Sequence, residues 1–288
     1  MRLHGSIIIL FFLLNYVGHP HIIAQINKRK LAEDMLAKMA TIQTLKYTLY
    51  KKERFGTKFR ESEIEVKYRK SPFACYVYFY KPDPGMEVLL VENQNDGKAW
   101  VNPNKKVLNF LDLDFDPYGK TMRKDEHHTL YENGFEYTRT LLKHSIEVAD
   151  KEGKFDEYYT LDGETNFNGR ACFKVILEYP PFKWQSYTVK EGEDLVKIAR
   201  RLFLNEYIIM EKNNLSFYYS VKAGQRIEIP NMFARKVILY VDKINLLPIF
   251  QQVFDEKGLF EEYHYKNLIL NPSFAPKDFD KSNPDYHF

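Results

Sequence analysis

Three aspartates, Asp112, Asp114 and Asp116, stand at alternate positions in the segment DLDFDPYGKTMR. This spacing begins the calcium-binding loop of an EF-hand, in which carboxylate oxygens coordinate the ion. Calcium binding is not expected here, because Pro117 replaces the glycine that turns such a loop and Arg123 replaces its closing glutamate.

The histidines and cysteines do not form a recognisable reactive group either. His127, His128 and His144 lack the H-E-x-x-H spacing or the cysteine partners of a zinc site, so we interpret them as solvated side chains. Cys75 and Cys172 lie in apolar runs and either pair in an oxidising compartment or remain buried thiols. The sequence contains no G-x-S-x-G motif and no phosphate-binding glycine loop. It therefore predicts no catalytic residue, no metal site and no cofactor, and favours a protein that is not an enzyme.

A compact helical unit lies between strand-like segments, in YTVKEGEDLVKIARRLFLNEYIIMEKNNLSFYYSVKAGQRIEIP, which begins at Tyr187. A short strand is followed by a turn at Gly192, by an amphipathic helix, by a second helix that starts at Asn205, and by the closing strand RIEIP. An insertion is tolerated when its ends lie close together, because the strands of its host then keep their pairing. We predict an inserted strand–helix–helix–strand unit over residues 184–230.

This unit resembles the LysM module, whose pattern runs Y-x-V-x-x-G-D-x-L, then I-A, then N-N-L, then V-x-x-G-Q-x-L-x-I-P. The positions in register are Tyr187, Val189, Gly192, Leu195, Ile198, Ala199, Asn213, Asn214, Leu215, Val221, Gly224, Gln225, Ile229 and Pro230. LysM modules bind glycans that contain N-acetylglucosamine, chiefly peptidoglycan and chitin, so the resemblance implies such a partner.

The resemblance also implies a shallow groove between the loop before the first helix and the loop after the second. Backbone groups there would bond the acetamide, while apolar side chains cover its methyl group. Glu193 and Asp194 stand where aspartate and threonine are usual, so a module that has kept the fold and lost its ligand remains an alternative. The expected glycan-binding residues are Gly192, Glu193, Asp194, Leu195, Asn214, Leu215 and Ser216.

The rest of the chain alternates between helical and strand periods. Apolar residues at helical spacing predict an amphipathic helix from about residue 27 to 44, and a second helical period covers residues 122–150. Short segments rich in β-branched and aromatic residues, bounded by Gly, Pro, Asn or Asp, predict antiparallel strands between and after these helices.

This order of elements resembles the LolA-type half-barrel of periplasmic lipoprotein carriers. Three segments also resemble an uncharacterised family of exported proteins with the same architecture: those around residues 66–103 and 240–274, and the tail DFDKSNPDYHF. The resemblance implies a concave apolar face that accommodates lipid or lipoprotein acyl chains beneath the first helix. Simple packing of these side chains on one another is the alternative. The expected cavity residues are Leu31, Met35, Met39, Tyr76, Tyr78 and Leu89.

The amino terminus predicts export. Arg2 precedes an apolar run from Ile7 to Leu14, which is too short to span a bilayer as a helix, and cleavage is expected after Ala24. The formal net charge of +3 and the scattered basic doublets argue against nucleic-acid binding.

Together these features predict an α+β fold: a curved antiparallel LolA-like sheet with helices on its concave face and an inserted βααβ LysM-like unit. The expected division is a signal peptide at 1–24, a discontinuous half-barrel at 25–183 and 231–288, and the insert at 184–230. We expect a non-catalytic protein of the periplasm of an outer-membrane bacterium. The alternatives are a wall-targeted enzyme that processes peptidoglycan and a scaffold that binds other envelope proteins.

Overall fold

A computed structural model describes residues 27–104 and 113–288. The predicted signal peptide and Asp112 lie outside the described residues. Within the described ranges, no helix has both the length and the apolar character that crossing a membrane requires.

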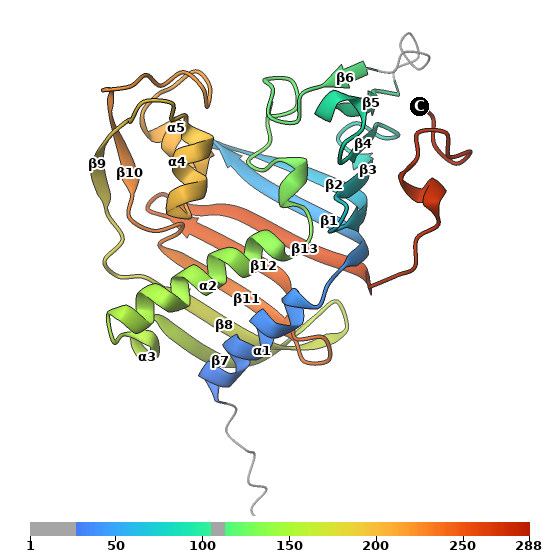
Figure 1. The fold of residues 1–288 in the computed structure, drawn as a ribbon. Helices are drawn as coiled ribbons and strands as arrows, with labels where there is room; N and C mark the ends of the chain where they lie inside the picture. Colours follow the sequence, from blue (N-terminus) through green and yellow to red (C-terminus); the bar gives the residue numbers. More distant parts are fainter. Residues whose placement is uncertain (1–26, 105–112) are drawn as a thin grey trace, which may run out of the picture.

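An antiparallel sheet of eleven strands dominates the fold, in the order β6-β5-β4-β3-β2-β1-β13-β12-β11-β8-β7 (Figure 1). It curves without closing, since β6 and β7 remain as edges. The observed α+β class and curved sheet confirm the prediction. The strands are β1 (Thr44–Phe55), β2 (Lys58–Arg69), β3 (Ala74–Lys81), β4 (Glu87–Val91), β5 (Ala99–Asn102), β6 (Leu113–Phe115), β7 (Tyr159–Phe167), β8 (Arg170–Glu178), β11 (Lys236–Asp242), β12 (Pro248–Asp255) and β13 (Gly258–Leu270).

Pairing between β1 and β13 joins the two halves of the sheet. Leu45 lies opposite Leu270, and the register continues to Glu53 opposite Glu261 with one irregularity. The β1–β2 hairpin closes at Phe55 opposite Lys58, and Gly56 takes the positive φ of +62° that its tight turn requires. The strand that ends the sheet in sequence therefore lies at its centre in space.

Two helices cross one face of the sheet (Figure 1). Helix α1 (Lys28–Ala40) begins at Asn27, whose side chain accepts hydrogen bonds from the backbone N–H groups of Arg29 and Lys30. Helix α2 (Glu136–Lys151) follows the loop after β6, and the short helix α3 (Phe155–Tyr158) leads into β7.

The prediction of a helical period over residues 122–150 is wrong for its first half. Only a short 3₁₀ turn, η2 (Leu130–Glu132), precedes α2. Gly134 takes a φ of +82°, and a Cβ at this position would lie 3.1 Å from the Tyr68 ring. A positive φ is incompatible with a right-handed helix, so α2 begins only after this glycine.

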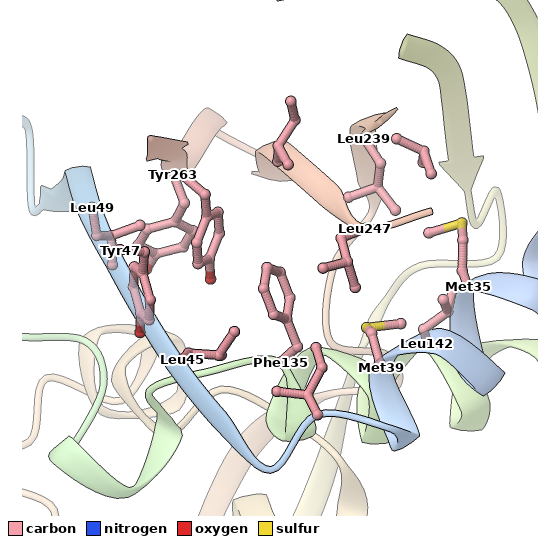
Figure 2. Close-up of a cluster of buried hydrophobic side chains, with 14 of the residues drawn as sticks. Met35, Met39, Leu45, Tyr47, Leu49, Phe135, Leu142, Leu239, Leu247 and Tyr263 are labelled. Atoms are coloured by element: carbon pink, nitrogen blue, oxygen red, sulfur yellow. The ribbon is translucent and has the colours of Figure 1, made fainter. Parts of the chain in front are cut away.

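The main core lies between the two long helices and the sheet. Figure 2 shows Met35 and Met39 of α1 directed toward Leu239 and Leu247, with Leu142 of α2 beside them. A smaller core covers the opposite face of the sheet, where the C-terminal tail packs on β3 and β4 through the 3₁₀ turn η3 (Pro276–Phe279) and residues up to Phe288.

The inserted unit consists of β9 (Trp184–Thr188), α4 (Leu195–Leu202), α5 (Glu206–Lys212) and β10 (Arg226–Pro230), with β9 and β10 paired antiparallel. Its core, which includes Leu195, Ile198 and Ile209, is continuous with Val253 of β12 and Phe260 of β13. The insert therefore packs directly on one end of the sheet.

Candidate functional site

A cavity of about 580 Å³ lies between the sheet and the segment that contains α2. This volume falls within the roughly 300–1,000 Å³ of small-molecule sites in proteins. Its walls are mostly apolar. Alternate residues of a strand point to the same face, so neighbouring strands contribute apolar side chains to one wall. Examples from five strands are Leu49, Ile64, Val77, Phe79, Val88 and Leu239.

The residues predicted on the first helix lie in the main core and are not among those that line this cavity. Leu31, Met35 and Met39 are buried, with exposed fractions of 4%, 1% and 1%, and pack in the main core. Leu31 and Met35 border a second void of only about 10 Å³, which is too small for a ligand. Their burial fits the alternative that these side chains pack on one another, and their role in ligand binding stays a prediction.

The prediction that Tyr76, Tyr78 and Leu89 line the cavity is wrong. Tyr76 and Leu89 are buried on the opposite face of the sheet, beneath the C-terminal tail, and Tyr78 packs against the same cluster. The ring of Tyr76 stacks on that of Tyr286 at a centroid distance of 4.0 Å. Residues on the two faces of β3 are equally apolar, so the sequence did not reveal which set faces the helices.

A buried network of charged side chains forms one end of the cavity. One imidazole nitrogen of His128, Nδ1, lies 2.9 Å from Glu132 Oε2, and the other, Nε2, lies 3.2 Å from Glu261 Oε1. The Tyr263 hydroxyl donates to Glu53 Oε1 at 2.7 Å. All five residues line the cavity, which therefore combines apolar walls with a polar end.

This network holds opposite charges together at neutral pH. Burial alone would lower the pKa of His128, but Glu261 and Glu132 outweigh it and raise that pKa well above its ordinary value. Burial alone would raise the pKa of Glu261, but the charge of His128 and hydrogen bonds from His127 and His128 lower it to about 2. His128 is therefore an imidazolium between two carboxylates.

The interpretation of the histidines as solvated is wrong. His127 is fully buried, with Nδ1 at 2.7 Å from Glu261 Oε1 and Nε2 at 2.9 Å from the Arg54 carbonyl oxygen. His144 of α2 is half-buried and also lines the cavity. The partners of His127 and His144 are far away in sequence, so no local spacing could indicate their burial. The two cysteines are free, buried thiols.

The predicted glycan-binding residues lie at the start of α4 and in the loop after α5. Asp194 caps α4 by accepting from the Lys197 backbone N–H at 2.8 Å, and Glu193 accepts from the Tyr187 hydroxyl at 2.6 Å. The backbone N–H of Leu195 donates to the Tyr218 carbonyl at 3.0 Å, which joins the two loops. Exposure differs among them: Gly192, Asn214 and Ser216 are exposed, Glu193, Asp194 and Leu215 are intermediate, and Leu195 is fully buried.

The burial of Leu195 excludes its side chain from glycan binding at this surface. Its side chain packs in the core of the insert and cannot cover a sugar methyl group. The side chains of Glu193 and Asp194 already cap the helix and its preceding turn. The exposed polar groups of this surface are thus mainly those of the loop after α5.

Polar contacts also fix the insert to the cavity. Arg200 of α4 pairs with Glu132, the Asn205 side-chain amide donates to Glu261 Oε1 at 2.9 Å, and Arg123 lies 3.2 Å from Glu206 with both side chains at most 1% exposed. Glu132 and Glu261 therefore bind both His128 and a residue of the insert.

The family model described as "Protein of unknown function (DUF1571)" matches residues 42–193 and 218–288, which is most of the chain. The chain belongs to the DUF1571 family. A LysM domain model matches residues 187–230, which confirms the LysM resemblance of the insert in this DUF1571 member. The gap in the DUF1571 match, residues 194–217, contains α4 and α5.

Solved structures similar to this DUF1571 member include LprF from Mycobacterium bovis, at 9% identity over 86% of this chain and 95% of the other, with a TM-score of 0.42. A LolA superfamily protein from Nitrosomonas europaea shares 10% identity over 87% and 97% (TM-score 0.31). A putative outer membrane lipoprotein-sorting protein domain from Vibrio parahaemolyticus shares 12% identity over 88% and 98% (TM-score 0.33). Likenesses this distant support no statement about function. No curated protein matches the chain.

Proposed function

We propose that this protein is a non-catalytic binding protein of the bacterial cell envelope. Its curved sheet holds an apolar ligand of the lipid or lipoprotein acyl-chain class, and its LysM-like insert binds peptidoglycan or another N-acetylglucosamine glycan. We assign the first task to residues 25–183 and 231–288 and the second to residues 184–230. A signal peptide at residues 1–24 would deliver the protein to the periplasm.

The cavity on the helix-covered face carries the lipid part of this proposal. Side chains in a well-packed core normally leave few voids larger than a water molecule. A space of about 580 Å³ with mostly apolar walls supports the binding of an apolar ligand. Its polar end, around His128, suits the head of an amphiphile whose apolar part lies against the sheet.

The LysM match and the exposed loop after α5 support the glycan part. A single module of this kind binds weakly, with a dissociation constant on the order of micromolar to millimolar. Retention at the cell wall would come from the many repeated sites of the polymer.

Native mass spectrometry of the purified full chain tests the lipid part. Co-purifying lipid, or uptake of an added fatty acid, is the expected result, and a chain that stays free of both would contradict it. Release of soluble muropeptides from purified sacculi by the wild-type protein would instead favour the enzyme alternative.

Sedimentation with purified sacculi tests the glycan part. Deleting residues 184–230 is a poor control, because it would remove the contacts that Glu132, Glu261 and Phe260 make with the insert. The sharper variant is Asn214→Gly. Glycine adopts the φ of +51° at this position freely, so the substitution keeps the backbone and removes only the exposed side-chain amide. We expect weaker sedimentation of this variant at unchanged thermal stability, with Asn267→Gly, a second position of positive φ outside the insert, as the control.

A further inference from the structure

Phe203 connects the insert with the cavity. It follows the last turn of α4, its ring stacks on that of His144 at a centroid distance of 4.2 Å and an angle of 19°, and both side chains line the cavity. Phe203 therefore brings an aromatic wall into the cavity from the LysM-like unit. Burial lowers the pKa of His144, so the imidazole under this ring is neutral at pH 7 and the stack is an apolar surface.

The backbone of Phe203 is unfavourable for its residue type. Its φ of 55° and ψ of 45° are left-handed, and its N–H closes the helix on Ala199 and Arg200. Glycine usually takes this place after a helix, because a side chain there costs roughly 1–2 kcal/mol. A bulky ring at such a position indicates that the ring itself has a task that glycine could not perform.

The first turn of the same short helix is joined to the loop after α5, because the Leu195 backbone N–H donates to the Tyr218 carbonyl oxygen at 3.0 Å. Asp194 and Leu195 stand at the first end of α4, and Arg200 and Phe203 stand at the other. Eight residues of helix span about 12 Å. Arg200 pairs with Glu132, which in turn holds His128 at the polar end of the cavity. A shift of α4 would therefore reach both sites.

We propose that Phe203 contacts the apolar ligand in the cavity and that, through α4, ligand binding in the cavity and glycan binding by the insert are thermodynamically linked. This inference rests on the proposed function. It makes the LysM-like unit a part of the lipid site in addition to a wall anchor. Linkage of this kind is reciprocal, so each ligand changes the affinity of the other by the same factor.

Fluorescence titration of the full chain with dansylaminoundecanoic acid tests the contact. Phe203→Gly should weaken binding of this probe about tenfold, the effect of losing a partly buried aromatic side chain. Glycine adopts the left-handed backbone of this position without strain, so the variant should fold. If its thermal stability equals that of the wild type, weaker probe binding is not due to a folding defect. Phe203→Tyr should bind as the wild type does, and Ile244→Ala, at a position 83% exposed, serves as the control. Equal affinity of Phe203→Gly and wild type would overturn the contact.

Repeating the titration with saturating tetra-N-acetylchitotetraose tests the linkage. We expect the probe affinity to change at least about fivefold in the wild type and not in Phe203→Gly. An unchanged wild-type affinity, with both ligands shown to bind, would refute the linkage and leave the proposed function standing. A wild-type chain that binds no probe would refute the lipid function and this inference together. A chain that binds the probe but no sugar would refute the glycan function and the linkage, while the Phe203→Gly comparison would still decide the contact.

Discussion

Replacing Glu261 by glutamine probes the buried network that joins the insert to the cavity. One oxygen of this carboxylate, Oε1, lies within hydrogen-bond distance of His127, His128 and Asn205. Glutamine keeps the size of the side chain and removes its charge. The His128 imidazolium would then lose one of its two carboxylate partners in a buried site, which is strongly unfavourable.

The magnitude follows from the pKa of Glu261, which falls from an ordinary 4.5 to about 2 in the folded protein. At about 1.4 kcal/mol for each pKa unit, the ionised form contributes roughly 3 kcal/mol to the free energy of unfolding at neutral pH. Loss of one partner of a buried ion pair typically costs a similar roughly 3–5 kcal/mol. For a chain of this size, a loss of about 3 kcal/mol corresponds to a fall in Tm of about 6–12 °C.

Urea unfolding of wild type and Glu261→Gln between pH 7 and pH 3 measures this contribution. Because the pKa is lowered on folding, the contribution is complete above about pH 4.5 and is lost as the pH falls toward 2. The two proteins should therefore differ by about 3 kcal/mol at pH 7 and converge in acid. Glu164→Gln, which breaks an exposed pair with Lys243, is the matched control and should cost less than about 1 kcal/mol. A cost for Glu261→Gln no larger than that of the control, or one independent of pH, would refute the reasoning.

Three further predictions concern the cavity, the network and the tail. Val77→Trp places a larger side chain in the cavity and should weaken binding of the fatty-acid probe at least about tenfold in fluorescence titration. An unchanged affinity would mean that the probe binds elsewhere. The raised pKa of His128 stabilises the wild type fully below about pH 6.5, and this stabilisation is lost as the pH rises through the raised pKa. His128→Asn should remove it, so the unfolding free energies of the two proteins should converge in alkali. A difference that stays constant with pH would contradict the raised pKa of His128. Tyr286→Ala removes the ring stacked on Tyr76 and should lower the free energy of unfolding by about 1.5–3 kcal/mol. It should also speed tryptic cleavage within residues 277–285, which mass spectrometry follows. Unchanged cleavage would show that the ring does not hold the tail.

The contacts of α4 and α5 bear on how the inserted unit works. A module joined only by flexible linkers would place the host near the wall without affecting its ligand. Here Arg200 and Asn205 share their carboxylate partners with His128. The insert thus stabilises the polar end of the cavity whether or not glycan is bound.

Local spacing in the sequence was sufficient for the insert and for most element types, with the first half of the helix predicted at residues 122–150 as the exception. Apolar residues at helical intervals predicted α1, short segments bounded by turn residues predicted antiparallel strands, and the fixed intervals of the LysM pattern predicted the βααβ unit. These features depend on interactions between residues close in sequence, which a periodic pattern records directly.

Only the tertiary structure decided which side of each strand faces the cavity and which charges are buried together. In β3, ACYVYFYK, both faces are apolar, so alternation gave no indication that Val77 turns toward the helices and Tyr76 toward the C-terminal tail. The partners of Glu261, at positions 127, 128 and 205, lie far from it in the chain. The physical reason is that burial, pKa and cavity shape arise from neighbours brought together by folding, and spacing along the chain does not record them.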